Sequence, residues 1–465
     1  MKLRIAQLLV GLPLGLCAFG HTVPDTSAQT ATNLYSFLGS PGDGYFPYAG
    51  LVQGSDGNFY GTTASGGAST NCYYGCGTVF RISPSGNYTS LYSFAGPPND
   101  GGNPLGGLIQ ASDGNFYGTT SNAFGTVFRI SPDGVYTNLY FFGGSPNDGK
   151  YPKATLVQGS DGNFYGTTGG GGVHNVGTVF RISPTGNYTN LSSFGTSSPG
   201  RFNTDGANPL GGLVQGSDGN FYGTTSGGGP GTVFRISPDG NRTNLHLFFG
   251  PPDGSYPTAG LVQGNDGNFY GTTLNGGALN GGIVFRISSS GNYTNLHSFA
   301  GPPNDGGRPL AGLVQGSDGN FYGTTWDSSS LFRISPDGTY TNFGGAPGTL
   351  AAGLIQGNDG NFYGTSTDGG TNGAGTVFKL TVPLNPPANQ ISAIQFFSLF
   401  DIMGVGALIP SVAGEIYRLQ YTDSMFPTNW INTGGSLTSL GGPMILIDFT
   451  EVLPPQRFYR VAITP

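Results

Sequence analysis

Hydrophobic and polar residues alternate in short runs along most of the chain, and four runs return in the same order. The recurring runs are LVQG, NFYGTT, TVFRIS and YTNLYSF, which are rich in β-branched and aromatic residues. The first two runs are joined through Asp-Gly, and the last two through Pro-Asp-Gly or a close variant. Asp-Gly between strand formers is typical of a β-hairpin, because the turn needs positive φ angles that glycine tolerates. The pattern therefore predicts four-stranded antiparallel meanders.

The four-run unit occurs seven times, and successive copies are 57, 48, 57, 48, 52 and 41 residues apart. Apolar side chains fall on both alternating sets of positions, so each sheet has two faces to bury. Four-stranded units of this size that pack against two neighbours are typical of a β-propeller, and seven units predict seven blades. One tyrosine in each NFYGT core marks the copies: Tyr60, Tyr117, Tyr165, Tyr222, Tyr270, Tyr322 and Tyr363.

The two ends of the repeat array complement each other. The seventh copy stops after GTVFKLT at residues 375–381 without a fourth strand, whereas a matching strand, TNLYSF, stands alone at residues 32–37. This offset lets the first strand complete the last blade, which closes the ring and removes exposed sheet edges. We therefore expect an all-β, seven-bladed propeller over residues 32–382, closed by its N-terminal strand.

A second module is expected at the C-terminus. The proline-rich linker at residues 383–390 is followed by strand-like runs at residues 393–399, 415–421, 444–449 and 458–463. Apolar and polar residues alternate along the second of these runs, as in a strand with one buried face. We expect a small β-sandwich over residues 391–465.

Composition narrows the class of protein further. Glycine accounts for 86 of the 465 residues and proline for 33, while 13% of the residues are aromatic and only 9% are charged. This balance suits an all-β protein and argues against an ordinary helical or α/β enzyme. The formal net charge is −7, so the basic surface that attracts nucleic acid is absent and no nucleic-acid partner is expected. We expect the protein to be a monomer.

The first residues have the pattern of a secretory signal peptide. Lys2 and Arg4 precede an apolar run at residues 8–20, and small residues suited to cleavage follow before residue 29. The run is shorter than the roughly 20 residues that a bilayer core needs, and no later segment reaches that length. We therefore expect residues 1–28 to be removed, and the mature protein to be secreted, on the cell surface or periplasmic.

At the repeated GLVQGSDGNFYGTT and GTVFRISPDGNYTNLYSF motifs, the chain resembles the tandem GloVer-type repeats of exported proteins from Gloeobacter and Verrucomicrobia-like bacteria. The resemblance covers roughly residues 32–381 and implies an exported surface or secreted protein, without implying an activity. More distantly, DGNFYGTT followed by GTVFRISPDG is similar to the blades of streptogramin-lyase-like and gluconolactonase-like propellers. Those proteins are enzymes, so this second resemblance implies a catalytic alternative.

The catalytic alternative lacks the residues that such enzymes use. Gluconolactonase-like propellers place a glutamate, asparagines and aspartates on a divalent metal, and streptogramin lyases pair histidine with glutamate. Here the only glutamates are Glu415 and Glu451, both in the C-terminal module, and His246 and His297 occupy a position filled by tyrosine in other copies. No catalytic residue is therefore assigned. His174, in a variable loop, is either a ligand-binding residue or an ordinary surface histidine.

Comparison of the seven copies shows which segments vary. The first-to-second and third-to-fourth hairpins are nearly constant, whereas the second-to-third loops and the crossovers between blades differ in length and sequence. In a propeller these variable segments share one face, where binding functions accumulate, although neutral drift of loops is the alternative. Trp326 and Asp327 depart from the repeat pattern and are candidates for contacting a sugar ring.

These observations predict a non-catalytic binding or structural protein. Its variable face would recognise extracellular carbohydrate or an envelope protein. The alternative is a propeller lyase or hydrolase with an active site at the mouth of the central channel.

An aspartate followed by glycine recurs in the crossovers. Several such carboxylates could bind Ca²⁺ or a polyol, whereas Asp-Gly can instead form a turn in which the carboxylate accepts hydrogen bonds from local amides. No copy has the dense Asp-x-Asp-x-Asp spacing of a dedicated calcium loop, so no metal ligand or cofactor is assigned. The ligand-binding candidates of this set are Asp43, Asp100, Asp148, Asp205, Asp253 and Asp305.

Other repeated polar positions have structural explanations. A cation on every third strand and an aspartate in every first hairpin, such as Arg81 and Asp56, predict a staple within each blade. A glutamine on every first strand, such as Gln53, either lines the axial channel or forms hydrogen bonds between blades. Cys72 and Cys76, in the first variable loop, predict a local disulfide, because an exported protein meets an oxidising compartment.

Overall fold

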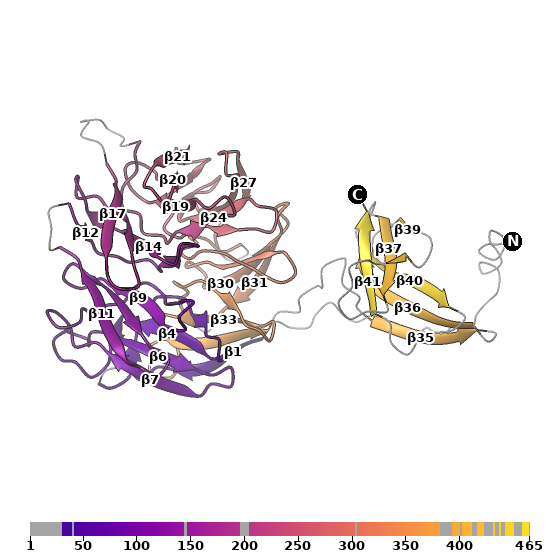
Figure 1. Cartoon of the computed structure of the whole chain (residues 1–465), viewed down its shortest axis with the longest axis horizontal. Helices are drawn as coiled ribbons and strands as arrows, with labels where there is room; N and C mark the ends of the chain where they lie inside the picture. The colour runs from indigo at the N-terminus through magenta and orange to yellow at the C-terminus, as the bar shows by residue number, and fades with distance from the viewer. Residues whose placement is uncertain are drawn as a thin grey trace.

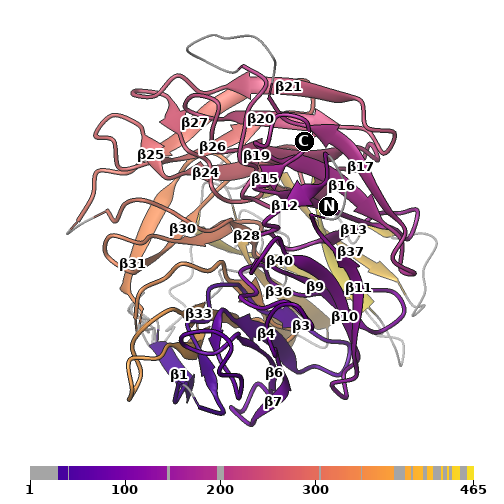
Figure 2. The same ribbon diagram turned by 90° about the vertical axis from the view of Figure 1, so that its left-hand side faces the viewer.

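The computed structural model describes residues 30–39, 41–143, 147–195, 204–302, 305–346 and 348–381, together with seven strands of the C-terminal region. The predicted signal peptide and linker lie outside the described residues. Seven four-stranded antiparallel sheets surround a central axis, and Figure 2 shows them following one another around the ring. All of the described secondary structure is strand. The predicted seven-bladed propeller is confirmed.

Each blade contains a short inner strand, two central strands and an outer strand. Blades one to four consist of β3 (Val52–Gln53), β4 (Phe59–Thr63), β6 (Thr78–Ile82) and β7 (Tyr88–Ser93); β8 (Ile109–Gln110), β9 (Phe116–Thr120), β10 (Thr126–Ile130) and β11 (Tyr136–Phe141); β13 (Val157–Gln158), β14 (Phe164–Thr168), β16 (Thr178–Ile182) and β17 (Tyr188–Ser193); and β18 (Val214–Gln215), β19 (Phe221–Thr225), β20 (Thr232–Ile236) and β21 (Arg242–Leu247). Blades five to seven consist of β23 (Val262–Gln263), β24 (Phe269–Thr273), β26 (Ile283–Ile287) and β27 (Tyr293–Ser298); β28 (Val314–Gln315), β29 (Phe321–Thr324), β30 (Ser330–Ile334) and β31 (Tyr340–Gly345); and β32 (Ile355–Gln356), β33 (Phe362–Ser366), β34 (Thr376–Thr381) and β1 (Thr30–Ser36).

The last blade is completed by the first strand of the chain. β1 pairs antiparallel with β34, with Thr30 opposite Thr381 and Ser36 opposite Thr376. In Figure 1 the indigo β1 accordingly lies beside the orange strands of the seventh blade. The predicted circular closure is confirmed, and β34 has no open edge.

The hydrophobic core lies between the blades. Each tyrosine of an NFYGT motif is fully buried and packs its ring on the phenylalanine of the same motif in the next blade, with ring centroids 3.9 to 4.2 Å apart. Such offset aromatic pairs add to the stability gained from burying the rings. The seven pairs are Tyr60–Phe116, Tyr117–Phe164, Tyr165–Phe221, Tyr222–Phe269, Tyr270–Phe321, Tyr322–Phe362 and Tyr363–Phe59.

The glutamine on each first strand forms a hydrogen bond between blades, which decides between the two explanations offered for it. Gln110 Oε1 accepts a bond from the Ser55 amide of the preceding blade at 2.8 Å. The same contact joins the last blade to the first, where the Asn358 amide donates to Gln53 Oε1 at 2.9 Å. The ring is therefore closed by side-chain hydrogen bonds as well as by β1.

The aspartate in the first hairpin of each blade is held mainly by the tyrosine of the same blade. Tyr60 donates its hydroxyl hydrogen to Asp56 at 2.9 Å, and Arg81 lies opposite Tyr60 in the strand register. Burial of the phenol, together with this bond to a carboxylate, raises the pKa of Tyr60 to about 12. In the seventh blade, Lys379 Nζ lies 3.0 Å from Asp359 and 5.6 Å from the centre of the Tyr363 ring. The tyrosine–aspartate bond recurs in all seven blades, whereas within the described residues an ion pair between the predicted cation and this aspartate is found in the seventh blade.

The C-terminal strands form two sheets. One contains β35 (Ala393–Leu399), β36 (Ile402–Ser411) and β40 (Gly442–Thr450). The other contains β37 (Ile416–Thr422), β38 (Ile431–Asn432), β39 (Leu437–Thr438) and β41 (Phe458–Thr464). Strands occur in all four predicted runs, while the packing of the sheets into a sandwich stays a prediction.

Among the described residues, no helix has the length and apolar character required to cross a membrane.

Candidate binding site

The variable segments lie together on one face of the propeller, here called the variable face. Because every blade runs as an antiparallel meander, the second-to-third loops and the crossovers emerge at the same end of the strands. In three blades the crossover pairs with the loop as a short ribbon: β2 (Gly44–Tyr45) with β5 (Ser65–Gly66), β12 (Gly149–Lys150) with β15 (Gly170–Gly171), and β22 (Gly254–Ser255) with β25 (Asn275–Gly276).

In six of the seven crossovers, one residue adopts a backbone conformation that side chains other than glycine rarely take. These six residues have φ angles between 50° and 58°, in the left-handed region. They are followed by proline in the sequence and vary widely in side chain. With Thr349, which holds the same place in the seventh blade, they are called the rim residues: Phe46, Asn103, Tyr151, Asn208, Tyr256, Arg308 and Thr349.

Main-chain hydrogen bonds to two different loops hold the six left-handed rim residues, whereas the Thr349 amide donates to the Asp368 side chain. The Arg308 amide donates to the Gly281 carbonyl of the preceding blade at 2.7 Å, and the Arg308 carbonyl accepts from the Trp326 amide of its own blade at 3.2 Å. The following proline, Pro309, packs closely against Gly282, where a Cβ atom would stand 2.8 Å from the proline Cδ. Since main-chain atoms and proline supply these contacts, the rim side chain can vary without loss of the fold.

The residue two positions after each rim residue also varies, and the seven residues at this position surround the opening of the central channel. These mouth residues are followed by alanine, glycine or threonine, which line a channel of about 420 Å³. Small side chains are needed there because seven inner strands converge on the axis. The mouth residues are Tyr48, Leu105, Lys153, Leu210, Thr258, Leu310 and Ala351.

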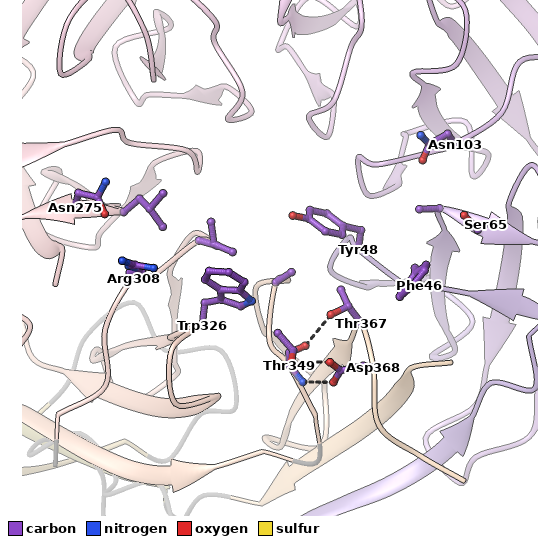
Figure 3. A pocket seen from close by; sticks show the side chains of 14 residues that line it. Phe46, Tyr48, Ser65, Asn103, Asn275, Arg308, Trp326, Thr349, Thr367 and Asp368 are labelled. Carbon is purple, nitrogen blue, oxygen red and sulfur yellow. Dashed lines mark hydrogen bonds between the residues drawn. The ribbon is translucent and has the colours of Figure 1, made fainter. Parts of the chain in front are cut away.

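A hollow of about 940 Å³ opens on the variable face over blades five, six, seven and one; it is called the bowl. Trp326 and Tyr48 line it, with 43% and 45% of their surfaces exposed. In Figure 3, Trp326 lies beside Arg308, and Tyr48 faces them with Phe46 behind it. Exposed aromatic faces surrounded by amide and hydroxyl groups favour a ligand that is both ring-shaped and rich in hydroxyl groups.

The charged groups around the bowl are compensated. Arg308 Nε lies 3.7 Å from Asp327 Oδ2, and both side chains are partly exposed. Asp368 accepts hydrogen bonds from the amide and the hydroxyl of Thr349 at 2.6 and 2.7 Å, which Figure 3 marks with dashed lines. The bowl therefore suits an uncharged ligand better than a strongly ionic one.

The predicted candidates on variable loops have different positions. Trp326 lines the bowl, and Asp327 lies next to it in the ion pair with Arg308. His174 is exposed on the second-to-third loop of the third blade, near Gly195, and does not line the bowl. Sequence reasoning missed the rim and mouth residues. In six copies a rim residue precedes a proline and a mouth residue follows it, so two variable positions around a repeated proline could have identified both sets.

The six crossover aspartates lie at the outer seams between blades and do not line the bowl. Asp43 accepts bonds from the Tyr35 hydroxyl at 2.9 Å and from the amides of Leu38 and Gly44 at 2.7 Å. Asp100 and Asp148 accept the hydroxyl groups of Tyr92 and Tyr140 in the same way. These are the contacts expected of a turn-forming aspartate.

In the other three seams, cationic or imidazole groups replace the tyrosine hydroxyl. Asp205 forms an ion pair with Arg242 at 2.7 Å. Asp253 and Asp305 bind the imidazoles of His246 and His297 at 3.1 and 2.9 Å. Both imidazoles stack on a tyrosine of the next blade at 3.9 Å, so they have the packing roles predicted for them. Within the described residues, no three histidine, cysteine, aspartate or glutamate side chains are grouped to hold a metal ion.

Cys72 and Cys76 are joined by a disulfide, with their Cα atoms 5.2 Å apart. The bond closes a loop of the first blade on the variable face. Two tyrosines, Tyr73 and Tyr74, lie inside this loop and are 92% and 55% exposed.

Fold and site together define a closed seven-bladed propeller with one constant face and one diversified face. The sequence matches the Gloeobacter/Verrucomicrobia repeat family over residues 22–202, 71–250 and 200–342. The chain therefore belongs to this repeat family, as its motifs predicted. A search of curated protein sequences gives no match.

Solved structures with the same fold include two lyases and the extracellular domain of a putative two component system. A streptogramin B lyase is 18% identical, with a TM-score of 0.54 over 76% of this chain and 97% of that one. Virginiamycin B lyase from Staphylococcus aureus is 17% identical, with a TM-score of 0.51 over 76% and 99% of the two chains. The extracellular domain of a putative hybrid two component system from B. thetaiotaomicron is 12% identical, with a TM-score of 0.51 over 94% of this chain and 55% of that one. At these identities the likeness concerns the fold alone.

Proposed function

We propose that the protein is an exported, non-catalytic binding module that recognises a neutral extracellular carbohydrate in the bowl. One observation carries the proposal. In six blades the rim backbone has the same left-handed conformation, whereas the rim side chain is phenylalanine, asparagine, tyrosine or arginine and the mouth side chains range from alanine to lysine and tyrosine. Diversity placed on a constant scaffold is typical of recognition surfaces.

The chemistry of the bowl supports a sugar as the ligand. The faces of Trp326 and Tyr48 carry negative π density that attracts the weakly positive C–H bonds on one face of a sugar ring. Asn103, Asn275 and Thr367 line the same hollow and offer donors and acceptors to hydroxyl groups. The chain charge of −7 and the pairing of Arg308 with Asp327 disfavour an acidic polymer.

The residues around the bowl do not favour the lyase or hydrolase alternative. Asp368 is the one carboxylate among the lining residues, and it is occupied by two bonds from Thr349. The two histidines with carboxylate partners, His246 and His297, lie at the outer seams.

Export is supported by the N-terminal sequence pattern, and a sandwich fold of the C-terminal sheets is part of the same proposal.

A glycan array tests the proposal directly. The chain without residues 1–28 is screened with and without Ca²⁺, and hits are measured by titration calorimetry with wild type, Trp326→Ala and Tyr48→Ala. We expect each variant to lose about tenfold or more in affinity, which corresponds to about 1.4 kcal/mol. Phe249→Ala is the matched control, because this aromatic residue is 80% exposed and does not line the bowl. Silence of the array in both conditions would refute the proposal.

A further inference from the structure

The disulfide loop of the first blade presents two aromatic side chains to solvent. Tyr73 is 92% exposed and Tyr74 is 55% exposed. Large exposed aromatic side chains that lie side by side are unusual on a soluble surface and mark interaction sites. The loop belongs to the variable face, which also carries the bowl.

The loop is held in one conformation from several sides. The Gly75 amide donates to the Cys72 carbonyl at 3.0 Å, and the Gly66 amide donates to the Tyr74 carbonyl at 2.6 Å. Outside the disulfide, the side chains of Ser69 and Asn71 each donate to the Ala95 carbonyl at 2.8 Å. A surface fixed in advance loses little entropy when it binds.

A continuous line of aromatic rings leads from this loop to the bowl. Tyr73 and Tyr74 meet edge to face with centroids 4.6 Å apart, and Tyr74 meets Tyr45 edge to face at 5.8 Å. Tyr45 lies 3.8 Å from Phe46, which lines the bowl. These four residues, Tyr73, Tyr74, Tyr45 and Phe46, are called the aromatic track.

The track is uncharged along its length. Residues 44–48 and 71–76 contain no acidic or basic side chain, and the carboxylate of neighbouring Asp43 is occupied by Tyr35 and two amides. A chain of neutral rings matches such a surface, because each ring can present an apolar face while its hydroxyl groups stay in water.

We propose that the aromatic track is an extended subsite, so that the ligand is a neutral oligosaccharide or polysaccharide chain with several units bound beyond the bowl. The inference rests on the proposed carbohydrate function and adds to it the length of the ligand and the direction in which it runs, over the first blade.

Chain length is the variable that tests the inference. The probes are α-1,4- and β-1,4-linked glucose oligomers of two to eight units, together with any neutral oligosaccharide that binds on the array. For wild type, we expect affinity to rise with the number of units beyond those that the bowl holds. Tyr73→Ala/Tyr74→Ala should lose about tenfold for the longest oligomers and keep the affinity for the shortest. Trp326→Ala should weaken all lengths.

Two further variants distinguish binding by the aromatic track from a general effect of changing exposed side chains. Cys72→Ser/Cys76→Ser keeps both tyrosines and frees their loop, so we expect an intermediate loss for long oligomers alone. Phe249→Ala removes an exposed aromatic residue elsewhere and should change nothing.

The possible failures are distinguishable. If wild type binds short and long oligomers equally, or if the tyrosine double variant keeps the dependence on length, the track is not a subsite and the bowl function stands. If wild type binds no oligomer, both proposals are overturned. If the tyrosine pair proves necessary for capture of a protein and not of sugar, the inference is wrong.

Discussion

At the residue scale, tyrosine carries much of the structure because one side chain supplies both an apolar ring and a polar end. Tyr117 packs its ring on Phe164 of the next blade, with centroids 4.0 Å apart, and donates its hydroxyl hydrogen to Asp113 at 2.8 Å. The ring therefore joins two blades, while the hydroxyl group closes the first hairpin of its own blade. The same arrangement recurs in each copy, so its effect can be tested in one.

The hydroxyl contribution can be measured by replacing Tyr117 with phenylalanine. This change keeps the stack on Phe164 and leaves Asp113 without one donor, so we expect the free energy of unfolding to fall by about 1.5 kcal/mol. Urea unfolding measures the difference. Tyr73→Phe, at an exposed hydroxyl, is the control and should have no effect. Equal stability of Tyr117→Phe and wild type would show that the hydroxyl bond makes no net contribution to the free energy of unfolding.

The hairpin aspartates also make stability depend on pH. Burial acts to raise their pKa values, but bonds from tyrosine, asparagine and, in one blade, lysine outweigh it, so the pKa lies below 3.8 and reaches about 2 for Asp359. As the pH falls, the unfolded chain takes up protons first, so this stabilisation is complete above about pH 4 and is lost as the pH falls through the folded values. The first-hairpin aspartates with a lowered pKa are Asp56, Asp113, Asp161, Asp218, Asp266 and Asp359.

We therefore expect unfolding midpoints in urea to be level from pH 5 to 7 and to fall steeply between pH 4 and 2. Asp359→Asn should be less stable than wild type at pH 7 and should show a shallower fall, because one titrating group is gone. A wild-type stability that stays constant down to pH 2 would contradict the role given to these carboxylates.

At the scale of the structural element, the crossover shows how strain and variability coexist. Six rim residues lie in the left-handed region, which costs a residue other than glycine roughly 1 kcal/mol or more and is easiest for asparagine. The cost is offset by two main-chain bonds, one to a loop of the preceding blade and one to a loop of the residue's own blade. At Tyr256 these bonds run from its amide to the Pro230 carbonyl at 2.6 Å and from the Leu274 amide to its own carbonyl at 3.1 Å.

Substitution at Tyr256 separates strain from packing. Tyr256→Asn should keep or raise the free energy of unfolding, by up to about 1 kcal/mol, because asparagine tolerates φ of 55° and already occupies this place at Asn103 and Asn208. Tyr256→Val should lose about 1 to 2 kcal/mol, because a β-branched side chain fits that region poorly. Thermal and urea unfolding give both values. The explanation fails if valine is tolerated as well as asparagine.

At the scale of the whole molecule, closure joins segments more than 300 positions apart. Asn358 donates to Gln53 across a separation of 305 residues, and Thr365 bonds to the Ala49 carbonyl across 316. Closure gives each of the seven sheets a neighbour on both sides, so the tyrosine–phenylalanine pair recurs at all seven seams.

Removal of β1 tests closure. A chain that starts at residue 38 lacks the partner of β34 and also Phe37, a fully buried residue. Compared with a chain that starts at residue 30, we expect it to unfold at a lower temperature and to form dimers or aggregates through the open edge. Calorimetry and light scattering would detect these changes. A monomer with unchanged melting temperature would disprove the structural role of β1.

Much of this architecture was predictable from sequence because its causes are local and repeated. Asp-Gly at the hairpins, alternating apolar residues and the lone strand at residues 32–37 specify turns, sheets and closure without knowledge of distant contacts. The partner of Gln53 was not predictable, since the choice between channel and seam depends on how neighbouring blades are rotated. The left-handed rim was also missed, because a residue before proline is expected to be extended, and the bonds that reverse this preference come from two separate loops, one of them in the preceding blade.

The register of the closing ladder has a mechanical consequence. Thr30 lies opposite Thr381, so the first and last residues of the ring lie at the same end of one strand pair. A force that pulls these two residues apart would load the hydrogen bonds one after another, as in opening a zipper, instead of sharing the load across the ladder as in shear. The torus would thus have a defined point of rupture under tension, at the junction between its beginning and its end.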